Sequence, residues 1–123
     1  MIELNKLSKT IHEANKAKGF YDEKTEIGTK LMLVVSELAE GMDADRKGLH
    51  AKVDQFEQLI KSGEYSFQDA FKSTIKDTFE DEMADTIIRM FDLSGFLEID
   101  IEKHIELKLK YNATRPPKHG KNY

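Results

Sequence analysis

The chain contains no cysteine, and this absence removes two kinds of site at once. Neither a disulfide framework nor a thiolate metal site is available, so zinc held by sulfur is excluded, while a reducing compartment is compatible. Only two prolines occur, both near the end of a chain rich in Lys, Glu, Leu and Ile, which favours helices over strands. No apolar run approaches about 20 residues, and the first twenty residues do not form a signal peptide. We therefore expect an all-α, soluble and cytoplasmic protein that does not associate with membranes.

Length and charge distribution set further limits. A chain of 123 residues is large enough to bury a core and too short to divide comfortably, so we predict a single domain over residues 1–123. The formal net charge is −4, yet the segment from Leu107 to Tyr123 carries five basic residues and no acidic one. The rest of the chain is therefore strongly acidic. This separation suits a protein that holds cations in one place and anions in another.

Apolar residues recur every three or four positions in the first half of the chain, which is the spacing of amphipathic helices. The pattern predicts a first helix near residues 3–18 and a second near residues 27–46. A third helical piece is expected from Leu49 to Ile60. Residues 48–67 could then form an inserted hairpin or lid between two longer helices.

The second half of the chain continues the helical pattern. Ser66, with Asp69 three residues later, has the spacing of a helix cap. The apolar stripe that follows reaches Gly95, either as one long helix or as two with a break near residues 76–78. Asp100 then has the character of an N-cap for a last helix. We therefore predict a bundle of four or five helices.

Two pairs of acidic residues lie beside the apolar stripes. Glu37 and Glu40 are three positions apart in "SELAE", and Glu82 and Asp85 repeat this spacing in "EDEMAD". Residues three apart are neighbours on one helix face, so each pair is expected at the edge of the core. If the two helices pack through their apolar stripes, four carboxylates converge on one cleft.

Converging carboxylates require a compensating positive charge, because at about 4 Å and an effective dielectric constant of ~20 each pair repels by roughly 4 kcal/mol. Hard carboxylate oxygens without histidine or cysteine at ligand spacing select Mg²⁺ or Mn²⁺ over zinc or copper. A ferritin-like di-iron site would use E-x-x-H, and the histidines of this chain miss that spacing. Either pair alone is common on a solvated helix face. Two pairs in a similar phase favour a magnesium site.

The basic C-terminal segment has residues that suit a phosphate. Lys108 and Asn112 are four apart on the last helical turn, and Arg115 and Lys118 follow. Lysine neutralises a phosphate as a point charge, and arginine binds one with a planar fork of donors, so a triphosphate would fit these residues. The alternative is a frayed basic tail over residues 110–123. The acidic remainder of the chain and the lack of interleaved aromatic residues argue against a nucleic-acid partner.

Taken together, "SELAE", "EDEMAD" and the terminal "KYNATRPPKHGK" resemble the MazG-like, all-α nucleoside triphosphate pyrophosphohydrolases. The N-terminal "IHEANKAKGFYD" and the following "IGTKLMLVVSELAEGMDADRKG" are similar to the start of the small single-domain members of that family. The resemblance covers nearly the whole chain. It implies a MazG-like bundle that assembles as a homodimer or homotetramer.

The resemblance also implies roles for individual residues. The family signature, E-x-x-E on one helix and E-x-x-D on another, binds Mg²⁺ and falls here on Glu37, Glu40, Glu82 and Asp85. The C-terminal Lys, Asn and Arg of such proteins act near the phosphates and sugar, which corresponds to the basic segment described above. The family often has Trp where this chain has an aromatic pair ending at Tyr21, which would either stack on a base or serve as an ordinary core aromatic.

One departure from the family concerns spacing. Forty-one residues separate Glu40 from Glu82, more than in compact relatives. This extra length is the reason to expect an inserted segment between the two acidic helices.

These observations lead to one main hypothesis and two alternatives. The main hypothesis is Mg²⁺-dependent hydrolysis of a nucleoside or deoxynucleoside triphosphate to the monophosphate and pyrophosphate, with Mn²⁺ as a substitute and Glu40 as the general base. The first alternative is a non-catalytic helical module whose acidic face and basic tail bind a partner protein. The second is a pyrophosphohydrolase acting on a phosphoribosyl nucleotide. The base, the sugar and the number of metal ions are left open.

Overall fold

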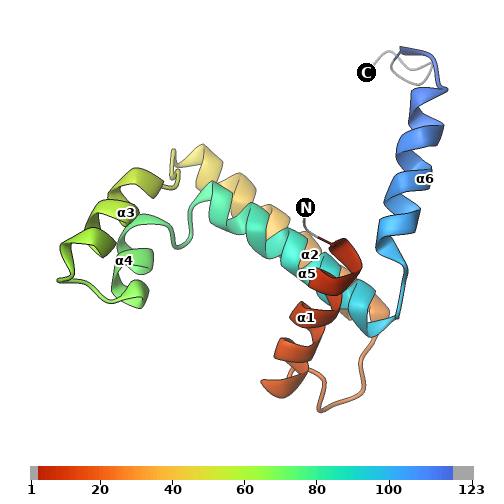
Figure 1. The fold of residues 1–123 in the computed structure, drawn as a ribbon, viewed down its shortest axis with the longest axis horizontal. Helices are drawn as coiled ribbons and strands as arrows, with labels where there is room; N and C mark the ends of the chain where they lie inside the picture. Colours follow the sequence, from red (N-terminus) through yellow and green to blue (C-terminus); the bar gives the residue numbers. More distant parts are fainter. Residues whose placement is uncertain (1–2, 118–123) are drawn as a thin grey trace. The chain divides into compact units, whose positions relative to one another are not determined.

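The computed structural model describes residues 3–117, and every regular element within this range is a helix (Figure 1). The predicted all-α class is therefore confirmed. None of the helices in this range is long and apolar enough to cross a membrane. In chain order, the helices are α1 (Leu4–Ala17), α2 (Ile27–Arg46), α3 (Val53–Ser62), α4 (Phe67–Thr74), α5 (Phe79–Phe96) and α6 (Ile101–Ala113).

Two predicted helix caps are confirmed. The Ser66 hydroxyl accepts a hydrogen bond from the Asp69 backbone N–H at 3.1 Å, at the start of α4. The Asp100 carboxylate accepts one from the Lys103 backbone N–H at 3.1 Å, at the start of α6. Each side chain supplies an acceptor for a backbone N–H that has no partner inside its own helix.

The long apolar stripe of the second half is divided into two helices, so the described residues form six helices instead of the four or five predicted. Helix α4 ends at Thr74 and α5 begins at Phe79, which confirms a break near the predicted place. Within the break, Asp77 has φ of 63°, a left-handed conformation that an α-helix cannot contain.

The chain divides into two compact units. The first unit comprises the described residues up to Glu23 and those from Phe91 onward. The second unit runs from Lys24 to Met90. The prediction that residues 1–123 act as a single domain stays a prediction.

In the first unit, α1 lies against the last turns of α5. The contact is so close that a Cβ atom at Gly95 would be 2.7 Å from the backbone oxygen of Ser8. Helix α6 is tied to the beginning of α1, where the Asn5 side-chain amide donates to Asp100 at 2.8 Å and the Asn5 backbone N–H donates to Glu102 at 2.9 Å. Gly95 on α5 therefore allows the close approach of α5 to α1.

In the second unit, α2 and the first turns of α5 run antiparallel. Arg89 near one end of the contact binds Glu37, while at the other end the Phe79 backbone N–H donates to the Leu49 carbonyl at 2.9 Å. Gly41 lies between these points, and a Cβ atom there would be 3.4 Å from the Glu82 Cβ. The missing side chain allows the two helix backbones to approach closely.

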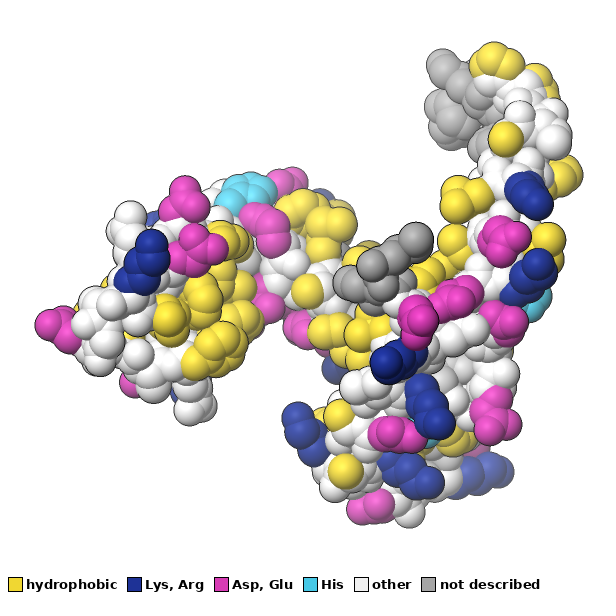
Figure 2. All heavy atoms as spheres, in the orientation of Figure 1, with side chains coloured by type: hydrophobic (Ala, Val, Ile, Leu, Met, Phe, Trp, Pro, Cys, Tyr) yellow, Lys and Arg dark blue, Asp and Glu magenta, His cyan; other side chains and the backbone are white. Residues whose placement is uncertain are grey.

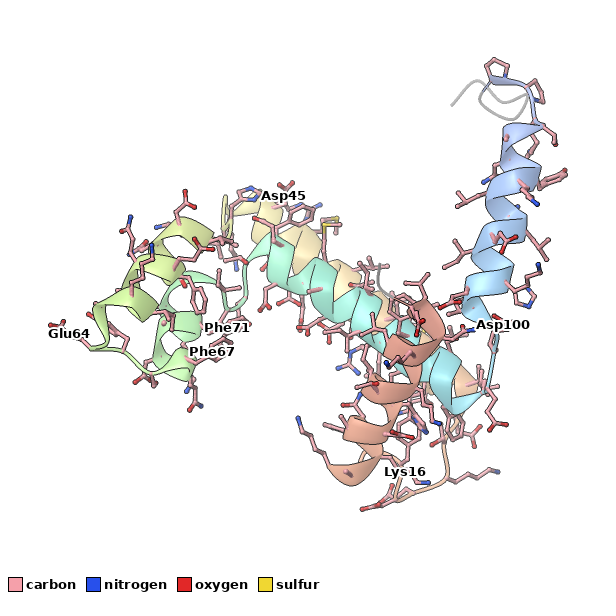
Figure 3. All side chains as sticks on the ribbon, in the orientation of Figure 1. Lys16, Asp45, Glu64, Phe67, Phe71 and Asp100 are labelled. Atoms are coloured by element: carbon pink, nitrogen blue, oxygen red, sulfur yellow. The ribbon has the colours of Figure 1, made fainter. Side chains whose placement is uncertain are left out.

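Helices α3 and α4 form a hairpin between α2 and α5. The Lys52 backbone N–H donates to the Thr74 carbonyl at 3.0 Å, which joins the two ends of the hairpin. Between the helices, Phe67 contacts the rings of Phe56 and Phe71, and hydrophobic side chains gather on this part of the surface (Figures 2 and 3). The sequence predicts an inserted hairpin over residues 48–67. The observed hairpin is longer because it includes all of α4, and its role as a lid stays a prediction.

Candidate metal centre

Three of the four predicted metal ligands lie together in the second unit. Glu37, Glu40 and Glu82 each offer a carboxylate oxygen, and these three atoms lie within 4.8 Å of one another. Glu37 and Glu40 come from neighbouring turns of α2, and Glu82 comes from α5 opposite them. The antiparallel contact at Gly41 places the two helices close enough for the three carboxylates to meet.

The three carboxylates differ in exposure. Glu37 and Glu82 are buried, with 8% and 5% of their surface exposed, while Glu40 is exposed at the edge of the group. A buried carboxylate is costly unless a cation or hydrogen-bond donors compensate its charge. Two members of the group therefore need a partner, and the third is open to solvent.

Glu37 has such a partner in Arg89 on α5. The guanidinium Nε donates to Glu37 Oε1 at 2.7 Å, a distance typical of a charge-assisted hydrogen bond. Burial alone would raise the pKa of Glu37, but the hydrogen bond from Arg89 and the surrounding groups outweigh burial and lower it. Glu37 is therefore held as an anion.

Glu82 has no comparable partner among the described residues. Its Oε2 atom is buried and makes no hydrogen bond within this part of the chain. Burial, followed by the neighbouring carboxylates of Glu37 and Glu40, raises the pKa of Glu82 from 4.5 to about 8. Without a cation, Glu82 therefore holds its proton at neutral pH.

Asp85, the fourth predicted ligand, lies outside the group of three mutually close oxygens. Its environment is still acidic, because burial and the charges of Asp81 and Glu37 raise its pKa. Asp85 thus belongs to the same electrostatic environment.

These residues fit a hard divalent cation. The donor set consists of carboxylate oxygens, the set that Mg²⁺ and Mn²⁺ prefer. The buried Glu82 oxygen, which lacks a partner within residues 3–117, is an atom that a cation would satisfy. A cation there would also replace the proton that the crowded carboxyl otherwise retains.

The predicted phosphate-binding residues belong to the first unit. The Lys108 ammonium and the Arg115 guanidinium lie 5.2 Å and 5.5 Å from the centre of the Tyr111 ring, so both cations lie over one aromatic side chain. Asn112 is next to this ring in sequence, and its side-chain oxygen is buried without a hydrogen-bond partner among the described residues. The structure therefore brings Lys108 and Arg115 together. Lys118 lies outside the described residues.

Tyr21 also belongs to the first unit, in a cluster of rings. Its ring stacks on Phe96 with centroids 4.8 Å apart and meets the edge of His12 at 4.6 Å. Burial and the nearby carboxylate of Asp92 raise the pKa of its hydroxyl. His12 Nδ1 lies 3.1 Å from the same Asp92 carboxylate. The predicted role of Tyr21 in stacking on a base stays a prediction.

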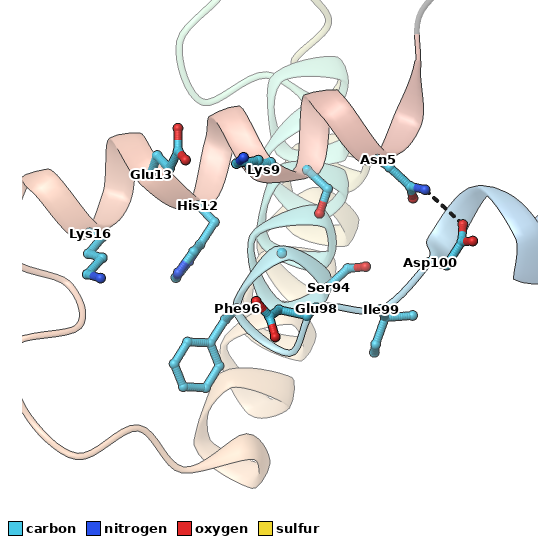
Figure 4. Close-up of a pocket in the computed structure, with 12 residues that line it drawn as sticks. Asn5, Lys9, His12, Glu13, Lys16, Ser94, Phe96, Glu98, Ile99 and Asp100 are labelled. Carbon is cyan, nitrogen blue, oxygen red and sulfur yellow. Dashed lines mark hydrogen bonds between the residues drawn. The ribbon is translucent and has the colours of Figure 1, made fainter.

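Each unit contains a cavity. A cavity of about 440 Å³ in the second unit is lined by the predicted metal ligands Glu40 and Glu82, together with Asp43, Lys47 and Asp77. A cavity of about 580 Å³ lies in the first unit, between one face of α1 and the end of α5 (Figure 4).

Sequence reasoning missed Arg89, which compensates Glu37. Its position carried a signal, because Glu82, Asp85 and Arg89 follow the i, i+3, i+7 spacing of one helix face. It also missed Asp77, in the break before α5, and Asp81, in the first turn of α5, whose carboxylates lie close to that of Glu82.

Comparisons with known protein families, with curated proteins and with solved structures gave no match to this chain.

Proposed function

We propose that this chain hydrolyses a nucleoside or deoxynucleoside triphosphate to the monophosphate and pyrophosphate, using Mg²⁺ held by Glu37, Glu40 and Glu82, with Asp85 beside them. The observation that carries the proposal is the buried Glu82 oxygen, which has no hydrogen-bond partner among the described residues and lies within a group of three close carboxylates. The ordered E-x-x-E and E-x-x-D pairs, with their resemblance to the MazG-like family and its helical bundle, supply the choice of reaction.

The carboxylates would have distinct roles. A divalent cation in this group would bind phosphate oxygens and lower the pKa of a bound water molecule. Arg89 fixes the orientation of Glu37 through the 2.7 Å hydrogen bond. Glu40 is exposed and lines the cavity of about 440 Å³, so it is the carboxylate that can accept a proton from an attacking water.

Lys108 and Arg115 are the proposed partners of the phosphate charge. Both carry a cation above the Tyr111 ring, and such a pair can stabilise the charge that develops on leaving pyrophosphate. Asn112 offers an amide to the sugar or the phosphates.

We further propose that the chain acts as a homodimer or homotetramer. Apolar residues at helical spacing are exposed on both acidic helices: Leu31, Val35, Leu38 and Met42 on α2, and Met83, Ile87 and Met90 on α5. Contiguous exposed apolar surface is unusual on a monomer. A second copy of this chain would cover it, and replacement of Leu38 by Glu should reduce the mass measured by sedimentation.

The test of the reaction is a panel of common and deoxy triphosphates and a phosphoribosyl nucleotide, each incubated with Mg²⁺ and resolved by chromatography. Monophosphate and pyrophosphate from the wild type, lost in Glu40→Gln and retained in Glu64→Gln, would support the proposal. Glu64 is an exposed residue in the turn between α3 and α4, so it controls for the loss of one charge (Figure 3). Diphosphate with free phosphate would mean that a different bond is cut. Absence of all turnover, with melting unaffected by Mg²⁺, would favour the non-catalytic interaction module.

A further inference from the structure

A second group of acidic residues adjoins the candidate metal centre. Asp77, Asp81 and Glu82 each offer a carboxylate oxygen, and these atoms also lie within 4.8 Å of one another. Glu82 therefore belongs to both acidic groups. A carboxylate has two oxygens, so one glutamate can bind two cations at once.

The local backbone explains how Asp77 and Asp81 meet. Asp77 occupies the left-handed turn before α5, and its backbone N–H donates to Asp81 Oδ2 at 2.9 Å. Lys76 binds the Asp77 carboxylate at 2.8 Å. These contacts explain the conformation of the turn, but they provide no hydrogen-bond donor for the buried Glu82 oxygen.

Glu82 supplies the independent observation. It is 5% exposed, its Oε2 atom has no hydrogen-bond partner among the described residues, and it lines the same cavity as Asp77 and Glu40. An unpaired buried carboxylate oxygen that faces acids from both sides is strongly unfavourable unless cations are present.

The charge balance favours two cations over one. When all six carboxylates of this region are ionised, they carry six negative charges, and the ion pairs of Arg89 with Glu37 and of Lys76 with Asp77 offset two of these charges. Four negative charges are then left for cations to compensate. One divalent cation would leave two negative charges and repel a triphosphate. Two would leave the region neutral. The six carboxylates are Glu37, Glu40, Asp77, Asp81, Glu82 and Asp85.

We propose that Asp77, Asp81 and Glu82 form a second divalent-cation site, and that the Glu82 carboxylate bridges it to the site formed with Glu37 and Glu40. The proposal rests on the proposed function and extends it, because paired cations clamp the attacking and leaving oxygens of a phosphoryl displacement. The cation class is Mg²⁺ or Mn²⁺, since all the donors are carboxylate oxygens.

Two variants test the second site with little change to the fold. Asn at position 81 keeps an oxygen that can accept the hydrogen bond from the Asp77 backbone N–H. Asn at position 77 tolerates the left-handed conformation better than most residues. Both variants therefore remove a ligand charge and preserve the turn, and circular dichroism melting of each would verify folding. Glu64→Gln again controls for the loss of one charge.

The experiment titrates the metal-free full chain with Mn²⁺ and follows binding by electron paramagnetic resonance. We expect two Mn²⁺ per chain in the wild type and in Glu64→Gln, with broadening as the second ion binds, because bridged ions lie about 4 Å apart. In Asp77→Asn and Asp81→Asn, the second dissociation constant should rise at least about tenfold, the lower end of the range found for outer partners of metal ligands.

The outcomes separate this proposal from the proposed function. A single Mn²⁺ in the wild type, or two equally tight ions in both Asn variants, would overturn the second site. The proposed function survives if the wild type binds a single Mn²⁺ and hydrolyses triphosphate, and if Glu37→Gln loses that ion. If no Mn²⁺ binds and no triphosphate is hydrolysed, both fail.

Discussion

Replacement of Glu82 by Gln should separate the electrostatic cost of the acidic group from its use in binding metal. Glutamine keeps the size and shape of the side chain and removes its charge. At the observed limit of 4.8 Å, one pair of ionised carboxylates repels by roughly 3.5 kcal/mol at an effective dielectric constant of ~20. Glu82 has two such neighbours, Glu37 and Glu40. Burial of Glu82, together with these neighbouring carboxylates, raises its pKa to about 8.

The sign of the pH dependence follows from this shift. Between pH 4.5 and about 8, the native state holds a proton on Glu82 that the unfolded chain has released, so metal-free stability falls as pH rises through this window. From pH 6 to pH 9 the wild type should lose roughly 2–3 kcal/mol from this group, which corresponds to about 10 °C in Tm for a chain of this size. The variant lacks the titrating group. It should therefore melt close to the wild type at pH 6 and well above it at pH 9.

The assay is thermal melting in EDTA and in Mg²⁺ at both pH values, with Glu64→Gln as the control. A cation at one hundred times its dissociation constant adds about 2.7 kcal/mol to the stability of the wild type. Glu82→Gln should lose most of this gain. A difference in Tm between variant and wild type that is the same at pH 6 and pH 9 would refute the electrostatic argument. Equal gains from Mg²⁺ in the two proteins would refute the role of Glu82 as a ligand.

Three further substitutions have definite expectations, each measured by thermal or urea unfolding. Gly95→Ala should destabilise the fold by about 1–3 kcal/mol, because the new Cβ would be 2.7 Å from the Ser8 backbone oxygen, whereas Gly28→Ala, with nothing within 4 Å, should be neutral or stabilising. Asp100→Ala should destabilise the fold, because it removes both the α6 cap and the acceptor of the Asn5 side-chain amide, and an unchanged stability would mean that both contacts are dispensable. Arg89→Leu should destabilise the metal-free chain, because it leaves a buried glutamate on α2 without its cation, and added Mg²⁺ should recover part of that loss.

The helices could be predicted because their signals are local. The 3.6-residue period gave the first two helices nearly to the residue, and the caps at Ser66 and Asp100 depend on side chains three positions from their backbone partners. The break before α5 was harder to place, because Asp77 adopts a left-handed turn that the apolar stripe does not signal. Local side-chain chemistry thus predicted where helices begin more accurately than it predicted where one helix is interrupted.

The candidate site was predictable in its acidic members and not in its cationic one. Spacing along a single helix is enough to place Glu37 beside Glu40, and Glu82 near Asp85. The partnership of Arg89 with Glu37 depends on the alignment of two helices that are 52 residues apart at this contact. Helical period places Arg89 on the same face of α5 as Glu82 and Asp85, but it does not fix the alignment of α5 with α2. The pairing of Arg89 with Glu37 could therefore be seen only in the folded chain.

Gly41 explains why the acidic pairs meet instead of remaining two separate faces. It follows Glu40 directly, and a Cβ there would be 3.4 Å from the Glu82 Cβ and 3.8 Å from the Phe79 ring. A larger side chain at this position would push α5 away from α2 and separate the carboxylates that now lie within 4.8 Å. Gly41→Val should therefore weaken Mn²⁺ binding even though position 41 offers no ligand. If binding were unchanged in a folded Gly41→Val variant, the close approach of the two helices would not be what assembles the centre.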